Sequence, residues 1–153
     1  MTDDAFDYLK RIPLFRDVPD SRITFERLGS FTNRSYKVSS PLGEHFLRVV
    51  GDGEAATLDR GIEWHNLEII QKAGLTAETL YFDLDSGLML SRFLSGARLL
   101  TGPILNSDFG SLRRAGKSLR RLHDCTPQFR GSFDISRHTE ESLAELNRLG
   151  TAP

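Results

Sequence analysis

The chain has 153 residues, of which 39% are hydrophobic and 27% charged, so it can bury one core but is short for two. Its 20 basic and 21 acidic side chains give a formal net charge of −1, which provides no overall field to attract nucleic acid or an anionic membrane. No apolar run reaches the roughly 18 residues that span a bilayer, and the acidic N-terminus is unlike a signal peptide. The single cysteine, Cys125, excludes an internal disulfide and fits a reducing compartment, so we expect a cytoplasmic protein.

The first half of the chain alternates apolar and polar side chains, as strands with one buried face do. The clearest example is the segment 23–28, which leads into a polar loop over 29–35. Further strands are expected, in chain order, over 36–39, 45–50, 79–82 and 88–90. A short helix over 4–11 is expected to brace the sheet, and it ends before Pro13 because the residue before a proline avoids helical geometry.

A longer helix is expected over 55–73, where apolar residues recur with helical spacing. At about 100° per residue, four of them fall in one arc that we expect to face the core: Leu58, Ile62, Ile69 and Ala73. Trp64 lies opposite this arc and is expected to pack against the other lobe or a segment that the chain lacks. Gly74 supplies the C-terminal stop.

After residue 91 the strand signals end and the remaining pattern is helical. Asn106 or Ser107 can cap a helix that ends near His123, and Thr139 can cap another that stops at Gly150. The sequence therefore predicts an α+β protein of two lobes. Its expected parts are a helical brace over 1–21, a strand-rich lobe over 22–91, a linker over 92–97 and a helical lobe over 98–153.

Arg48 is a cation inside an otherwise apolar strand, where it is costly unless it meets an anion. Two carboxylates on the following helix could pair with it. The helical period places Glu63 about 80° and Glu68 about 140° from the centre of the apolar arc, so Glu63 is preferred and Glu68 is expected in solvent. The alternative is an arginine that points to solvent from an edge strand. A cation paired in this way, beneath a loop of small residues such as Gly29 and Ser30, is how kinases hold nucleotide phosphates.

Six short motifs follow one another along the chain. They are LGSFTN at 28–33, FLR at 46–48, EWHN at 63–66, a glycine-to-strand segment at 74–82, GLMLSRF at 87–93 and LRRLH at 119–123. Together they resemble the choline/ethanolamine kinase-like branch of the aminoglycoside phosphotransferase superfamily, over roughly residues 22–135. The resemblance implies a protein-kinase-like fold, with an N-lobe of five antiparallel strands and one helix followed by the first helices of a helical C-lobe.

The resemblance also implies a nucleotide site, with ATP as the phosphate donor and a small amino alcohol such as choline or ethanolamine as the acceptor. Arg48 would occupy the usual kinase lysine position, with Glu63 as its partner. The loop 29–33 would cover the phosphates, and the backbone of 91–94 would face adenine. The implied nucleotide-binding residues are Gly29, Ser30, Thr32, Asn33, Arg48, Glu63, Ser91, Arg92 and Phe93.

The chain also departs from the family pattern. The branch usually has two glycines where this chain has Gly29-Ser30, and a proline at the position of Ala77. The family's His-x-Asp-x-x-x-x-Asn catalytic loop, and the acidic Mg²⁺ ligand after it, have no counterpart between His123 and Pro153. We therefore expect no catalytic residue and no metal ligand in this chain. The Mg²⁺ ligands are expected in a missing C-terminal part, so the chain would be an N-terminal fragment or a truncated product. The alternative is an inactive nucleotide-binding or protein-interaction module.

The other polar features favour structural interpretations. A basic stripe on one predicted helix has no interleaved aromatic side chains for base stacking, so we expect it to be solvated; it consists of Arg113, Arg114, Lys117, Arg120 and Arg121. The four histidines have no metal-ligand spacing. Cys125 has only Arg121 near it to activate a thiol, which does not indicate a catalytic cysteine.

Overall fold

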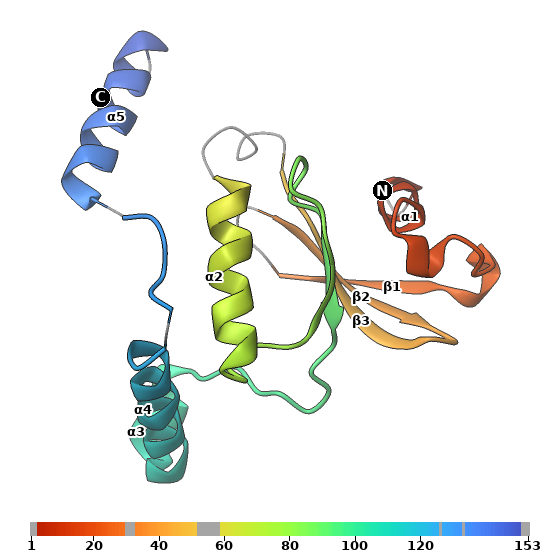
Figure 1. Cartoon of the computed structure of the whole chain (residues 1–153), viewed down its shortest axis with the longest axis horizontal. Coiled ribbons are helices and arrows are strands. Elements are labelled where there is room, and N and C mark those ends of the chain that lie inside the picture. The colour runs from red at the N-terminus through yellow and green to blue at the C-terminus, as the bar shows by residue number, and fades with distance from the viewer. Residues whose placement is uncertain (1–2, 30–32, 52–58, 126, 133, 151–153) are drawn as a thin grey trace.

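The computed structural model describes residues 3–29, 33–51, 59–125, 127–132 and 134–150, and its strands form one antiparallel sheet (Figure 1). The strands are β1 (Thr24–Leu28), β2 (Arg34–Ser40), β3 (Gly43–Val49), β4 (Thr79–Phe82) and β5 (Met89–Arg92). Their spatial order is β1-β2-β3-β5-β4, which places β3 at the centre. The predicted α+β fold with five antiparallel strands is confirmed.

Three of the helices begin at aspartate caps, and for the last two helices these caps are not the residues that the sequence suggested. They are α1 (Asp3–Lys10), α2 (Arg60–Lys72), α3 (Gly102–Ser107), α4 (Phe109–His123) and α5 (Ile135–Arg148), with 3-10 turns η1 (Pro13–Phe15) and η2 (Asp20–Arg22). Asp108 caps α4, whereas Asn106 and Ser107 end the separate helix α3. Asp134 caps α5, and Thr139 lies inside it with its hydroxyl donating to the Ile135 carbonyl.

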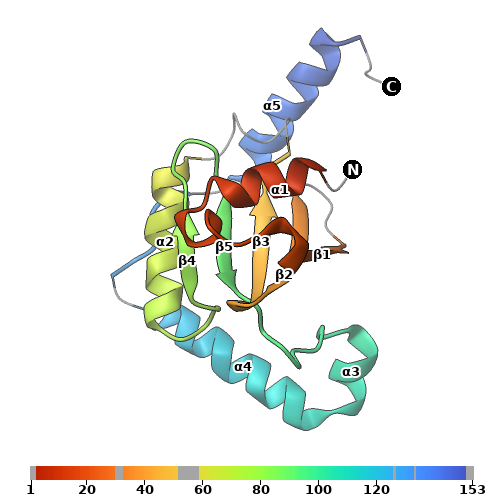
Figure 2. The same cartoon turned by 90° about the vertical axis from the view of Figure 1, so that its right-hand side faces the viewer.

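The hydrophobic core lies between the sheet and the N-terminal helix. Figure 2 shows α1 crossing one face of the strands. The core consists of Ala5, Leu9, Ile12, Phe15, Ile23, Tyr36, Val38, Leu47, Val49, Leu88 and Leu90. The strand members alternate along each strand, so the period of two puts them on a single face. Because each fully buried side chain of this size contributes about 1.5–3 kcal/mol, the segment before β1 holds the sheet firmly from this side.

His45 belongs to this buried layer, and it is a packed histidine rather than a ligand. It is 2% exposed, and its ring meets that of Phe15 edge-on at 5.3 Å between centroids. Burial lowers the pKa of His45 below its usual value, because the charged imidazolium is poorly solvated there.

Helix α2 covers the opposite face of the sheet (Figure 1), but its side chains do not all follow the predicted phase. Trp64 turns toward the sheet and packs on Phe82 of β4, with ring centroids 5.3 Å apart. Ile62 lies instead beside Gly131, and the carbonyl of Ala73 accepts a hydrogen bond from Arg121. The prediction that the arc faces the core holds for Ile69, which is 5% exposed, but it is wrong for Ile62 and Ala73, and Leu58 lies outside the described residues. The helix is covered from two sides, so its apolar residues do not mark one face.

The helical half exposes much of its apolar surface. Leu99 and Phe109 are 83% and 80% exposed, and the described side chains of α5 are all exposed. The five cations of the basic stripe are exposed as well, as expected. Within the described part of the chain, no helix is both long and apolar enough to cross a membrane.

Candidate functional site

The site is built around an ion pair between the sheet and α2. Arg48 of β3 lies opposite Ser35 and Met89 in the neighbouring strands, on the face away from the core. Its Nη1 is 2.5 Å from Oε1 of Glu63, and the two side chains are only 17% and 21% exposed. The ion pair predicted between Arg48 and Glu63 is present. Glu68 forms none of the ion pairs found among the described residues, and it is half-buried.

A second arginine shares the same carboxylate. Arg60, the first residue of α2, has its Nη1 2.7 Å from Oε2 of Glu63 and is 8% exposed. Arg48 also donates from Nη2 to the carbonyl of Gly87, at 3.1 Å. Its guanidinium lies over the ring of Phe82, at 5.8 Å from the centroid. Two cations, Arg48 and Arg60, therefore share the single carboxylate of Glu63.

The turn between β4 and β5 is stiffened by Asp83. Its Oδ1 accepts hydrogen bonds from the backbone N–H and the hydroxyl of Ser86 at 2.7 and 2.8 Å, and from the N–H of Asp85 at 3.1 Å. The bonds from Ser86 come first among the causes that hold the pKa of Asp83 below its usual range. The turn ends at Gly87, which has φ +69° and therefore adopts the left-handed geometry that glycine tolerates.

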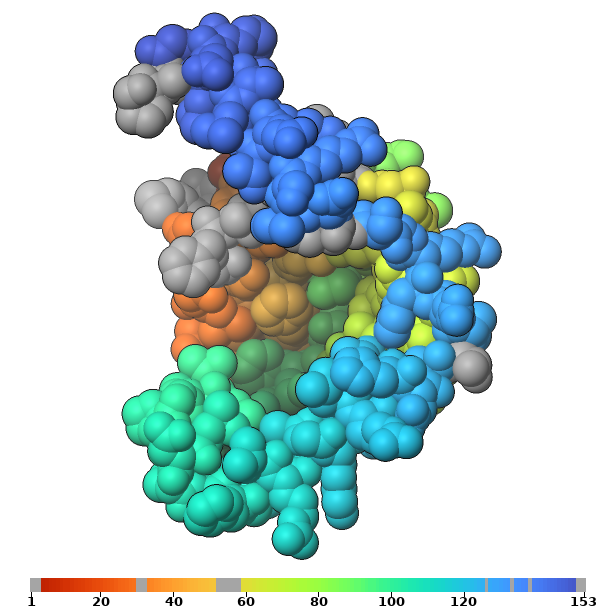
Figure 3. Space-filling view, turned by 90° about the vertical axis from the view of Figure 1, so that its left-hand side faces the viewer, coloured from red at the N-terminus to blue at the C-terminus, as the bar shows by residue number. Residues whose placement is uncertain are grey.

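A cavity of about 600 Å³ opens beside the ion pair. It is lined by Arg48, Asp59, Ile62, Glu63, Asn66, Leu67, Ile70, Met89, Phe129, Gly131 and Ser132. Asn66 joins α2 to the segment after α4 that forms the other wall of the cavity. The Asn66 side chain exchanges two hydrogen bonds with the backbone of Arg130, at 2.8 and 2.9 Å. Figure 3 shows this side of the molecule hollowed, with the strands recessed behind α2, α4 and the segment after α4.

A polar network joins the same sheet face to the chain after β5. Lys37 of β2 is 2.5 Å from Oε1 of Glu44, and its ammonium lies 4.8 Å from the ring centroid of Phe93. The hydroxyl of Ser95 donates to Oε2 of Glu44 at 2.6 Å, and the N–H of Phe93 donates to the Glu44 carbonyl at 3.1 Å. The bonds from Lys37 and Ser95 lower the pKa of Glu44. Glu44 therefore attaches the segment 93–95, which follows β5, to the sheet.

The other predicted site residues are spread around the sheet, and Arg92 lies in register with the core-side His45 and not with Arg48. Gly29 is exposed at the end of β1, Asn33 is half-buried just before β2, and Ser30 and Thr32 lie outside the described residues. Ser91 is buried opposite Phe46. The side chain of Arg92 pairs with Glu78 at 2.6 Å on an exposed edge, separate from the Arg48 ion pair.

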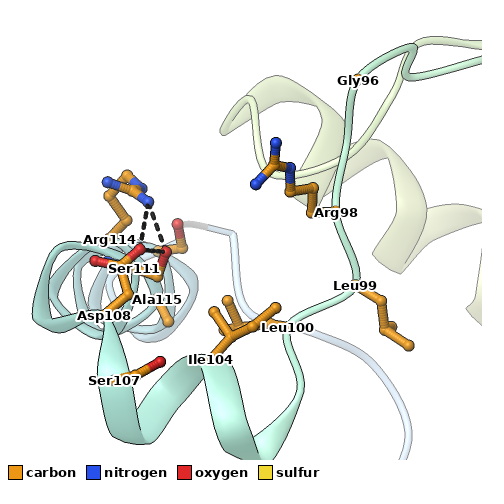
Figure 4. A pocket seen from close by; sticks show the side chains of 11 residues that line it. Gly96, Arg98, Leu99, Leu100, Ile104, Ser107, Asp108, Ser111, Arg114 and Ala115 are labelled. Atoms are coloured by element: carbon orange, nitrogen blue, oxygen red, sulfur yellow. Dashed lines mark hydrogen bonds and ion pairs between the residues drawn. The ribbon is translucent and has the colours of Figure 1, made fainter.

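A second cavity of about 670 Å³ lies between the segment 96–100 and helices α3 and α4. Figure 4 shows Asp108, Ser111 and Arg114 joined by hydrogen bonds at one side, and Leu100 and Ile104 side by side at another. The hydrogen bonds of Ser111 and Gly110 account for the lowered pKa of Asp108, with that of the Ser111 hydroxyl the largest cause. These contacts complete the cap of α4.

Sequence reasoning missed Arg60, Gly87, Lys37 and Glu44. The spacing of Arg60 and Glu63 is i,i+3 on a helix, which is a signal for side-chain pairing. Gly87 was identified only as the first residue of the motif at 87–93. The contact of Lys37 with Phe93 joins residues far apart in the chain, and local sequence gives no signal for it.

No protein-family model matches the chain. The solved structure of a choline/ethanolamine kinase family protein from Mesorhizobium loti matches it with a TM-score of 0.74 and 28% identity, over 95% of this chain and 46% of that one. The resemblance to choline/ethanolamine kinases is confirmed. LicA of Haemophilus influenzae is 27% identical over 122 residues, which are 80% of this chain and 36% of that protein. A structure of LicA in complex with AMP has the same fold, with a TM-score of 0.66 and 20% identity over 90% of this chain and 48% of that one.

The matches extend over the sheet and the helices that follow it. The predicted kinase-like N-lobe followed by the first C-lobe helices is therefore confirmed as a fold. The chain spans about half the length, or less, of these proteins.

Proposed function

We propose that the chain is the nucleotide-binding half of an ATP-dependent phosphotransferase of the choline/ethanolamine kinase type. The complete enzyme would phosphorylate the hydroxyl of a small amino alcohol. The observation that carries this proposal is the ion pair of Arg48 and Glu63 on the sheet face, because a cation held by a helix carboxylate beside a strand–loop–strand is the arrangement by which kinases hold phosphates.

Arg48 carries an unsatisfied donor that fits a phosphate. Among the described residues, Nδ1 of His45, Nε of Arg48 and Nη2 of Arg60 are buried without a hydrogen-bond partner, and of these three residues only Arg48 lines the cavity. A buried donor of this kind costs free energy until an acceptor satisfies it. A phosphate group supplies acceptor oxygens and a negative charge that pairs with a guanidinium.

The remaining residues are assigned to the nucleotide by this proposal. Gly29, Ser30, Thr32 and Asn33 would cover the phosphates from the β1–β2 connection. The backbone of Ser91, Arg92 and Phe93 would meet the base, at the start of the interlobe segment. The LicA structure in complex with AMP supports a nucleotide as the ligand of this fold.

Mg²⁺ is implied by the family, but the described part of this chain does not fit it. No three His, Cys, Asp or Glu side chains among those residues gather into a group that could hold a metal ion.

The proposal is tested by thermal denaturation with ATP, inorganic triphosphate or adenosine. At a hundredfold excess over Kd, a ligand stabilises the folded state by about 2.7 kcal/mol, which corresponds to about 5–10 °C for a chain of this size. ATP should raise Tm in this way, and triphosphate should do so less. An unchanged Tm at millimolar ATP would contradict nucleotide binding.

The acceptor is tested on a longer protein that contains this chain. With Mg·ATP and radiolabelled choline or ethanolamine, it should form the phosphorylated amino alcohol. ATP binding without transfer to either acceptor would favour the inactive nucleotide-binding module instead.

A further inference from the structure

Arg60 is the most deeply buried cation near the site, and its neighbours fix its position and leave space for its side chain. Asp59 caps α2 by accepting the N–H of Ile62 at 3.0 Å, so the position of Arg60 at the helix start is fixed. The guanidinium of Arg60 lies against Gly87, where an added Cβ would stand 2.8 Å from Arg60 Cζ and Nε. Only a glycine leaves room for this arginine.

Glu63 connects the two arginines through its two separate oxygens. Oε2 is held by Arg60 and Oε1 by Arg48. A carboxylate held at one oxygen only could rotate about its last side-chain bonds, whereas the second contact fixes the direction in which Oε1 points. The positive charge of Arg60 also offsets part of the negative charge of Glu63, so Glu63 neutralises less of the positive charge of Arg48.

Gly87 contributes a second constraint. Its carbonyl accepts from Arg48 Nη2 at 3.1 Å, while its missing side chain admits Arg60. The turn that carries Gly87 is itself held by Asp83 through Ser86. Both arginines therefore contact the same residue, Gly87, in a turn that hydrogen bonds hold in place.

We propose that Arg60 is a positioning residue that acts through Glu63 to set the orientation and the free charge of Arg48 for phosphate binding. The proposal rests on the proposed function, since the phosphate is that of the nucleotide. Arg60 itself need not touch the nucleotide.

The test is a double-mutant cycle on the affinity for ATP, measured by calorimetry. Arg60→Gln should weaken binding about tenfold in the wild-type background, because charged hydrogen bonds have about this strength. In the Glu63→Gln background the same substitution should change Kd less than about twofold, since Arg60 then has nothing to act through. A purely structural role would give the same loss in both backgrounds, and that result would overturn the proposal.

Arg148→Gln is the matched control. Arg148 pairs with Glu145 at 2.6 Å with i,i+3 spacing, but it is 70% exposed on α5. It should leave the affinity for ATP unchanged. If Arg60→Gln fails to fold, Arg60→Lys replaces it in the cycle. Lysine keeps the positive charge but lacks the planar guanidinium fork, so Arg60→Lys should lose less affinity for ATP, and that loss should again depend on Glu63.

A second measurement needs no nucleotide. The ¹⁵N NMR signal of the Arg48 Nε–H should shift in Arg60→Gln and stay in place in Arg148→Gln. An unchanged Arg48 signal in Arg60→Gln would overturn the proposal. If the wild-type chain binds no ATP, the proposed function fails, and the NMR result still decides whether Arg60 orients Arg48.

Discussion

Gly87→Ala should destabilise the fold well beyond the cost of an ordinary glycine substitution. Gly87 has φ +69°, and a left-handed conformation costs a residue with a Cβ about 1–2 kcal/mol. The new Cβ would also stand 2.8 Å from Arg60 Cζ and 2.9 Å from Val50 Cγ2, so Arg60 has to move away from Glu63.

The size of the second effect follows from the contact that is lost. A hydrogen bond to a charged group contributes about 1.5–3 kcal/mol, and Glu63 retains Arg48 as a partner, so the lower part of that range applies. Gly87→Ala should therefore cost about 3–4 kcal/mol, of which about 2 kcal/mol is the displacement of Arg60.

Gly74→Ala is the matched control, because Gly74 has φ +65° but its added Cβ would meet only Arg121 Nη2 at an ordinary 3.5 Å. Urea denaturation followed by circular dichroism gives both free energies of unfolding. The difference of about 2 kcal/mol between the two variants should shrink in an Arg60→Ala background, where the Arg60 atoms that meet the added Cβ are absent and only the contact with Val50 Cγ2 remains. Equal losses for Gly87→Ala and Gly74→Ala would refute the reasoning.

Three further predictions concern other parts of the molecule. The folded-state pKa of His45 is below its unfolded value near 6.5, so the unfolded state binds more protons and the free energy of unfolding should fall as pH drops below about 6.5. In urea titrations between pH 7.5 and 5.5, His45→Gln should make the free energy of unfolding depend less on pH. The same pH dependence in His45→Gln and the wild type would contradict this prediction. Glu44→Gln should speed hydrogen exchange at the amides of 93–97, because it weakens the bonds from Lys37 and Ser95, and unchanged exchange would show that Glu44 does not hold this segment. Phe109 is 80% exposed, so Phe109→Ser should lower aggregation measured by light scattering, whereas unchanged aggregation would show that this surface does not cause it.

The strands were predictable because one of their faces is buried and the other is not. β1 forms over Thr24–Leu28, and burial alternates along 23–26, but Arg27 is exposed where the period of two would bury it. The turn after β2 was predicted too long, since Ser40 pairs with Gly43 and leaves only two residues between the strands. Turn residues such as Pro41 mark the place of a turn but not its length.

The first residues of the helices and the buried face of α2 were harder to predict from the sequence than the strands. Three consecutive residues, Asn106, Ser107 and Asp108, can all cap a helix, and only the structure shows that Asp108 does so. The phase of α2 was only partly correct because the helix is covered by the sheet on one side and by the segment after α4 on another. Apolar residues such as Ile62 then serve the second contact, and the simple rule of one buried stripe fails.

The central ion pair was predictable in part. Arg48 in an apolar strand required an anion, and the helical period favoured Glu63 over Glu68. Arg60 and Gly87 were not found, because their contact joins positions 27 residues apart in the chain (87 − 60 = 27). A cluster of this kind depends on tertiary packing, which local patterns do not encode.

The most direct test of the account is a calorimetric titration of ATP into the wild-type chain, Arg48→Gln and Glu68→Gln. Glu63 keeps Arg60 as a partner when Arg48 is lost, so Arg48→Gln should remain folded. The account predicts saturable binding to the wild type, a loss of about tenfold or more in Arg48→Gln, and no change in Glu68→Gln. Equal affinities in the wild type and Arg48→Gln, or no binding to the wild type, would contradict it.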